Sequence, residues 1–186
     1  MEGSVFDTAK PAFATGFVLL TGLATVLLAS ACISPYWQST QYPTGVASIG
    51  LWQRAFESQP QPPLTDAMET ETRTTLSDPP PNFVAARTLG IVAAALAFAC
   101  IPAGAFLAST PGRWWKAVAT MALGLGGLMC GIALLIVWAT SPKPPPVATA
   151  ARADGTAFIA AGFWRALAGT VALAVAIVLN GLYCVV

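Results

Sequence analysis

Few side chains in this sequence could carry out chemistry, and their placement does not bring them together. The 186 residues include no histidine, which excludes a histidine general base and a histidine-ligated metal. All eight acidic residues lie outside the apolar stretches of the chain, so no pair of carboxylates meets inside them. No serine or cysteine has a base at a helical spacing that would activate it. The sequence therefore predicts a protein that is not an enzyme, with no catalytic residue, metal site or cofactor.

The composition indicates where such a chain is stable. Hydrophobic residues make up 56% of it and charged residues only 9%, whereas soluble domains carry about 25% charged residues. This number of charges is too small to cover the surface of a water-soluble globule of this size. We therefore expect an integral membrane protein surrounded by lipid. A bound lipid or sterol is the one small ligand that this leaves open. The net charge of +1 gives no reason to expect nucleic acid as a partner.

The apolar residues gather into stretches close to the length of about 20 residues that crosses a bilayer as a helix. These predicted helices span residues 13–33, 88–109, 117–139 and 158–186. The connections are a long polar loop over 34–87, a short turn over 110–116 and an intermediate loop over 140–157. We therefore expect one domain over residues 1–186, an all-α bundle of membrane-spanning helices.

The long first loop changes character along its length. Residues 41–56 carry apolar and aromatic side chains at spacings typical of short strands. Proline, threonine and acids dominate residues 58–81, which we expect to be irregular unless a partner orders them, with one or two helical turns over 68–76. The candidate partner contacts in this loop are Arg54, Asp66, Glu69 and Glu71. A solvated acidic loop is the alternative interpretation of these acids.

Short motifs stand at the ends of the predicted helices in a fixed order. Ser-Pro-Tyr-Trp follows the first helix, Gly-Leu-Trp lies in the first loop, an arginine enters the second helix, and Gly-Phe-Trp opens the fourth. The motif residues are Pro35, Trp37, Gly50, Leu51, Trp52, Arg87, Gly162 and Trp164. Together with the loop lengths, they resemble the claudin superfamily of four-span proteins, which includes peripheral myelin protein relatives and gamma-type auxiliary subunits of calcium channels and glutamate receptors.

The resemblance implies a fold and an orientation. It implies a left-handed four-helix bundle with a small extracellular β-sheet formed mainly by the first loop, in which Trp52 plugs the top of the bundle. The resemblance also implies that the protein lies in the plasma membrane with both termini and the short turn on the cytoplasmic side. The basic residues alone do not decide the orientation, because they lie near the helix ends on both sides of the membrane. Family members place two cysteines after Gly-Leu-Trp, but residues 53–82 contain none. The cysteines lie in or beside the predicted helices, at Cys32, Cys100, Cys130 and Cys184.

Several residues allow both a functional and a structural interpretation. We expect Trp37 and Trp52 to pack the loop onto the helix ends, with a recognition surface as the alternative. Arg87 is expected to satisfy loop carbonyls; the alternatives are that it lines a pore or meets a partner carboxylate. Arg165 lies inside the fourth predicted helix, so either that helix extends beyond the membrane or Arg165 is paired.

The third predicted helix carries closely spaced small residues. Gly124, Gly127 and Gly131 would let helix backbones approach closely in lipid. We expect this packing to occur within the bundle, and a docking face for another protein is the alternative. Asn180 in the fourth helix is a candidate for a hydrogen bond between helices.

These features favour a protein that acts through protein–protein interaction. We expect an accessory or structural subunit of a larger membrane complex, of the channel- or receptor-associated type. The missing cysteine pair favours this over a self-sufficient junction protein, because an unstapled loop is easiest to order on a partner. The alternatives are a claudin-like cell-contact protein that forms lateral polymers, a barrier or a paracellular ion path, and a small channel or transporter. The expected partners are other integral membrane proteins and membrane lipid.

Overall fold

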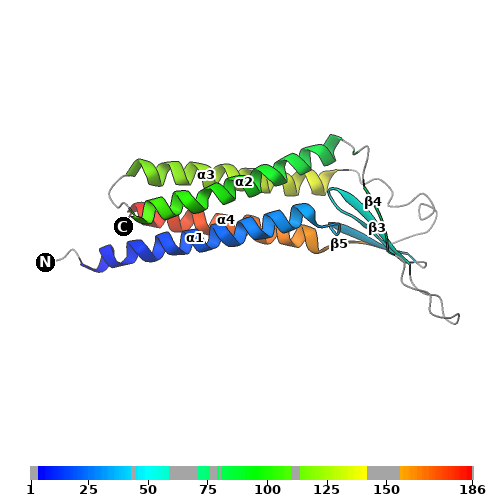
Figure 1. Cartoon of the computed structure of the whole chain (residues 1–186), viewed down its shortest axis with the longest axis horizontal. Coiled ribbons are helices and arrows are strands. Elements are labelled where there is room, and N and C mark those ends of the chain that lie inside the picture. Colours follow the sequence, from blue (N-terminus) through cyan, green and yellow to red (C-terminus); the bar gives the residue numbers. More distant parts are fainter. Residues whose placement is uncertain are drawn as a thin grey trace.

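Four long helices form a bundle with a small sheet at one end (Figure 1). The computed structural model describes residues 4–42, 45–58, 71–75, 79, 81–109, 114–141 and 156–185. The helices are α1 (Ser4–Ile33), α2 (Pro81–Ser109), α3 (Trp114–Thr140) and α4 (Ala161–Val185). The beginning of α1 and the end of α4 both lie at the end of the bundle away from the sheet (Figure 1).

Each helix contains a segment long and apolar enough to cross a membrane, judged by length and composition. These segments are Pro11–Ile33, Pro81–Leu107, Trp115–Thr140 and Ala161–Cys184. The prediction of a multi-pass membrane protein with four spanning helices is therefore confirmed at the level of the helices. The handedness of the bundle stays a prediction.

The second helix begins earlier than the hydropathy pattern indicates. It starts at Pro81 rather than at Thr88. Proline suits the first position of a helix, where its missing N–H has no partner to lose. The first two turns bury Phe83 and Ala86 in the core at the sheet end of the bundle. They are therefore only partly apolar and differ from the continuous apolar stretch by which a lipid-facing helix is predicted.

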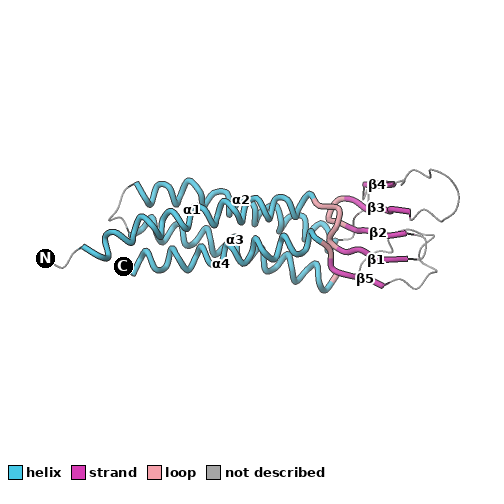
Figure 2. The backbone as a smooth tube through the Cα atoms, turned by 90° about the horizontal axis from the view of Figure 1, so that it is seen from below, coloured by secondary structure: helices cyan, strands magenta, loops and turns pink. Residues whose placement is uncertain are grey.

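The sheet has five strands in the order β4-β3-β2-β1-β5, all antiparallel (Figure 2). The strands are β1 (Gln38–Tyr42), β2 (Gly45–Ile49), β3 (Gln53–Ser58), β4 (Glu71–Thr75) and β5 (Thr156–Ile159). Strands β1 to β4 come from the segment between α1 and α2, which confirms the strands predicted over residues 41–56. Residues 71–75 do not form the helical turn that the sequence allowed over 68–76, because the threonine-rich β4 pairs with β3 instead. The rest of that range lies outside the described residues.

The fourth helix also starts later than predicted. Residues 156–159 form β5, which pairs with β1 so that Gln38 faces Ile159. The prediction that the helix starts at residue 158 is therefore wrong, and α4 begins at Ala161. The pairing fastens the segment before α4 to the strand that follows α1, so both loops on this side of the bundle share one sheet.

Small residues set the approach of α3 and α4. A Cβ added at Gly124 would meet Ile177 at 3.0 Å, one at Gly127 would meet Leu173 at 3.0 Å, and one at Gly131 would meet the Thr170 hydroxyl at 2.7 Å. The three glycines are buried and face α4, which is the expected packing within the bundle. They are not available as a docking face for another protein.

Polar groups in the bundle are largely satisfied by the helices themselves. The hydroxyls of Thr21, Thr120 and Thr170 donate to carbonyls one turn earlier, at 2.9, 2.8 and 2.8 Å. Asn180 is buried on α4, and its Nδ2 donates to the carbonyl of Ala117 on α3 at 3.2 Å. The predicted hydrogen bond between helices is therefore confirmed.

Candidate functional site

Trp37 fills the centre of the contact between the sheet and the bundle. Its side chain is 0% exposed, and its Nε1 donates to the Ala31 carbonyl at 2.6 Å, at the end of α1. The ring centroid lies 5.0 Å from that of Trp138 and 6.4 Å from that of Phe163, and Trp138 lies 5.1 Å from Phe83. These aromatic residues join the ends of all four helices beneath the sheet; we call them the aromatic junction.

The backbone around Trp37 is tied to both loops. The Trp37 N–H donates to the Ile49 carbonyl at 3.1 Å, and the Ala160 N–H donates to the Trp37 carbonyl at 3.1 Å. The Gly162 N–H donates to the Tyr36 carbonyl at 2.6 Å. The tryptophan is therefore held by β2 on one side and by the start of α4 on the other.

Two motif glycines are needed because other groups come too close for a side chain. A Cβ at Gly50 would lie 2.5 Å from the Ser34 carbonyl oxygen and 2.6 Å from the Cα of Pro35. A Cβ at Gly162 would lie 2.6 Å from Cδ1 of Trp37. All three distances are shorter than real Cβ contacts. Glycine at positions 50 and 162 therefore allows the Gly-Leu-Trp and Gly-Phe-Trp motifs to pack against the Ser-Pro-Tyr-Trp motif.

Arg87 connects α2 to the turn between β2 and β3. Its Nε donates to the Leu51 carbonyl at 2.6 Å, and its Cζ lies 4.5 Å from the centroid of the Trp52 ring. The turn itself is closed by a bond from the Gly50 N–H to the Gln53 carbonyl at 2.8 Å. The expectation that Arg87 satisfies a loop carbonyl is confirmed, and the contact with Trp52 is an addition to it.

The two residues after Gly50 have opposite environments. Leu51 is fully buried in the aromatic junction, whereas Trp52 is 40% exposed. The implied role of Trp52 as the plug of the bundle is therefore wrong. Within the turn that joins β2 to β3, the inward position is occupied by Leu51, which belongs to the same buried cluster as Trp37. Trp52 instead presents one face to Arg87 and leaves part of its ring open.

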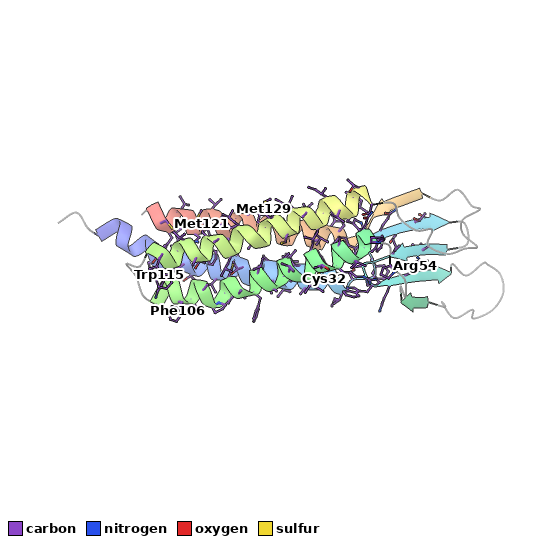
Figure 3. The ribbon with its side chains drawn as sticks, turned by 90° about the horizontal axis from the view of Figure 1, so that it is seen from above. Cys32, Arg54, Phe106, Trp115, Met121 and Met129 are labelled. Atoms are coloured by element: carbon purple, nitrogen blue, oxygen red, sulfur yellow. The ribbon has the colours of Figure 1, made fainter. Side chains whose placement is uncertain are left out.

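Two arginines near this turn have buried donors without an acceptor. Nη2 of Arg87 and Nε of Arg54 are both buried, and neither forms a hydrogen bond with the part of the chain that the structure describes. Arg54 lies on β3, opposite Ile49 of β2, at the end of the sheet nearest the bundle (Figure 3). Trp52, Arg54 and Arg87 together form what we call the arginine patch.

The structure places none of the remaining candidate residues in the arginine patch, as far as it describes them. Asp66 and Glu69 lie outside them, and for Glu71 the structure describes the backbone of β4 but not the side chain. Trp164 is exposed on α4, with its ring 6.0 Å from that of Phe163. Arg165 is also exposed. Pro35 is half-buried beneath the Gly50 turn.

Sequence reasoning missed part of the aromatic junction. Phe83, Trp138 and Phe163 come from three different helices and meet Trp37 only in the folded chain. The sequence held one signal of the junction: Trp138 and Phe163 lie at ends of predicted helices that are on the same side of the membrane. That position is equally typical of an interfacial anchor in lipid.

Among the described residues, no group of three histidine, cysteine, aspartate or glutamate side chains could hold a metal ion. The four cysteines are free thiols. No family model matches the chain, and no curated protein matches it either.

Proposed function

We propose that the chain is a claudin-like accessory subunit of a larger membrane complex and that it binds its partner through the arginine patch. The proposal includes a left-handed bundle in the plasma membrane, with the sheet outside and both termini in the cytoplasm. It assigns no enzymatic activity to the chain. The motifs support it, because their residues build one continuous junction rather than lying apart.

The unpartnered donors of Arg54 and Arg87 carry the proposal. A buried polar group without a hydrogen bond costs about 1–3 kcal/mol, and more when it is charged. A hydrogen bond from a guanidinium to a carboxylate is charge-assisted and about twice as strong as one between neutral groups, so a carboxylate is the acceptor that an open guanidinium donor favours. Both donors are covered by neighbouring atoms, so a carboxylate from another membrane protein reaches them only when those atoms move. It would then recover a cost that the isolated chain bears.

Trp52 supplies the apolar part of such a contact. Tryptophan and arginine are the residues most enriched where truncation weakens protein interfaces most. Here a half-exposed ring stacks on a guanidinium that is itself fixed to a backbone carbonyl. The patch is thus held in place before a partner arrives, which lowers the entropy lost on binding.

The proposal is tested by purifying the tagged full chain from its native membrane in mild detergent and quantifying every protein that co-elutes. We expect a larger membrane protein in fixed stoichiometry, and we expect Arg54→Gln and Trp52→Ala to reduce its recovery severalfold. Arg165→Gln is the matched control, because it removes an exposed charge from α4 without touching the patch. Recovery of the chain alone would refute the accessory role, and equal recovery of the partner with all variants would refute the arginine patch as its contact.

The sheet favours a second candidate function, a cell-contact protein that associates side by side. Its order leaves β4 and β5 as edge strands, each with one strand neighbour in the described chain. Open edges pair readily with other chains. Purification as homo-oligomers, together with concentration of the protein at contacts between cells, would support this candidate instead of the accessory subunit.

A further inference from the structure

A hollow opens between α2 and α3 at the end of the bundle away from the sheet. Its volume is about 390 Å³, and its wall includes Ala99, Pro102 and Ala103 from α2 and Ala119 from α3. Pro102 and Ala119 are exposed, and all four residues lie inside the membrane-spanning segments, so the hollow faces lipid. Small side chains at such a place let another helix approach closely in the membrane.

Pro102 removes a hydrogen bond from α2. Proline has no N–H, so the carbonyl of Phe98, four residues earlier, loses the donor that it would have in an uninterrupted helix. A helical carbonyl points along the axis toward the residue four positions later, so this oxygen lies beside the Pro102 ring in the wall of the hollow. An unsatisfied backbone group is costly in the hydrocarbon core, where no water compensates it. The hollow therefore combines space with an unmet hydrogen-bond acceptor.

The chain itself has no open hydroxyl for this carbonyl. In the four spanning segments, which the structure describes throughout, every serine and threonine donates to a carbonyl three or four residues earlier in its own helix, and none donates to Phe98. These residues are Thr15, Thr21, Thr25, Ser30, Thr88, Thr120, Thr140 and Thr170. A second copy of the chain has the same hydroxyls engaged, so it does not supply the donor either.

The depth of the carbonyl excludes lipid and water as donors. The α2 span ends at Leu107, which places the Phe98 carbonyl about 12 Å inside the membrane, close to the middle of a hydrocarbon core of about 30 Å. Acyl chains carry no donor. Headgroups and sterol hydroxyls stay at the surface, near Trp115 at the beginning of the α3 span (Figure 3). A water molecule needs several polar partners, whereas the residues around Pro102 in the hollow are alanines.

Phe98 and Pro102 lie on the side of α2 that also carries Arg87. The three residues are spaced by 11 and four positions, close to whole numbers of helical turns, so they are stacked along one side of the helix. Arg87 belongs to the arginine patch at the sheet end. A partner helix that runs along this side of α2 would therefore contact the patch and the hollow at the same time.

We infer that the hollow between α2 and α3 receives a transmembrane helix of the partner protein, and that a serine or threonine of that helix donates to the Phe98 carbonyl. Hydroxyl side chains form such bonds between membrane helices, and a small residue fits between alanines without pushing the helices apart. The inference rests on the proposed accessory role, because it assigns the hollow to the same partner.

The test is photo-crosslinking of the tagged full chain in its native membrane, with a photoreactive benzoylphenylalanine in place of Phe98. Phe98 is 63% exposed, so a larger ring is tolerated there beside the hollow. We expect a crosslink to a transmembrane segment of another protein that contains a serine or threonine, identified by mass spectrometry of the crosslinked peptide. The same group in place of Val175, an exposed residue of α4, is the matched control and should react with lipid.

Two variants separate the hydrogen bond from the space. Pro102→Ala restores the N–H that satisfies the Phe98 carbonyl, so the crosslink should fall about threefold, the factor expected for one hydrogen bond between membrane helices. The thermal unfolding midpoint should not fall, because alanine favours helix over proline. Ala119→Phe fills the hollow and should abolish the crosslink. Ala168→Phe, at an exposed alanine of α4, is the control and should leave the crosslink unchanged.

The outcomes distinguish this inference from the accessory role. A crosslink only to lipid or to a second copy, or one that is unchanged by Pro102→Ala or by Ala119→Phe, would overturn the inference. The accessory role would still stand if a partner co-purifies in fixed stoichiometry and Arg54→Gln reduces its recovery. Crosslinks to lipid alone, together with purification of the chain without a partner, would overturn both.

Discussion

The two ends of the bundle use the same interaction for different purposes. At the sheet end, Cζ of Arg87 lies 4.5 Å from the centroid of Trp52; at the far end, Nζ of Lys116 lies 4.5 Å from the centroid of Phe106. Arg87 also donates to the Leu51 carbonyl and stands beside a core closed by Trp37. Lys116 instead lines a hollow of about 390 Å³. A contact between a cation and an aromatic ring therefore does not by itself indicate what the residue does.

The difference lies in what fills the space around each cation. At the sheet end, aromatic side chains from α2, α3 and α4 and Trp37 after α1 occupy it, and the loops bond to one another through backbone groups. At the far end, alanines leave part of it unfilled. A substitution at the sheet end should therefore lower the stability of the fold more than one at the far end.

The largest effect is expected from Trp37→Ala. Removing a fully buried tryptophan costs about 3–5 kcal/mol, and the Ala31 carbonyl also loses its donor. The measurement is the thermal unfolding midpoint in detergent, with protease cleavage between β1 and β4 as a local readout. Trp164→Ala is the matched control, because that ring is exposed, and it should change the midpoint little. Equal shifts for the two tryptophans would mean that the sheet end is not closed around Trp37.

A smaller effect of the same kind is expected from Gly50→Ala. The added methyl group would collide with backbone atoms of Ser34 and Pro35, and overpacking of this kind costs about 1–3 kcal/mol. Gly22→Ala is the control, since nothing lies within 4 Å of a Cβ at that position of α1. It should leave the unfolding midpoint unchanged or raise it, because alanine favours helix by up to about 1 kcal/mol over glycine. A midpoint that falls for Gly22→Ala as much as for Gly50→Ala would contradict the contact geometry.

Arg87→Lys sharpens the comparison of the two cations. Lysine keeps the charge and can remain over the Trp52 ring, but it lacks the Nε that donates to Leu51. We expect a loss of stability of about 1.5–3 kcal/mol, the range of a single hydrogen bond from a charged donor. The thermal midpoint measures it, with Arg165→Lys as the control for the substitution itself. No loss would show that Arg87 acts mainly through its charge.

The sequence anticipated those parts of the fold that depend on local pattern. The helices follow from unbroken apolar stretches, and the interhelical role of Asn180 follows from a lone amide in such a stretch. The interpretation of Arg87 also held, because an arginine at the end of a span has few partners other than loop carbonyls. The glycines of α3 face α4, as their spacing suggested.

The parts that escaped prediction depend on contacts between distant segments. Strand β5 forms because residues 156–159 pair with β1. The sequence of four residues next to a helix does not indicate that pairing. The choice between Leu51 and Trp52 as the buried residue depends on which face of the turn meets Trp37. The hollow beside Lys116 forms because small residues of α2 and α3 lie opposite each other. The periodicity of a single helix cannot predict which residues of another helix it faces.

The smallest effect on stability is expected from Lys116→Met. In detergent, the loss of the ring contacts and the removal of a buried charge oppose each other, so the free energy of unfolding should change by less than about 1 kcal/mol. The thermal unfolding midpoints of the wild type and of Lys116→Met test this. A loss as large as that expected for Trp37→Ala would contradict the contrast between the closed sheet end of the bundle and the hollow at its far end.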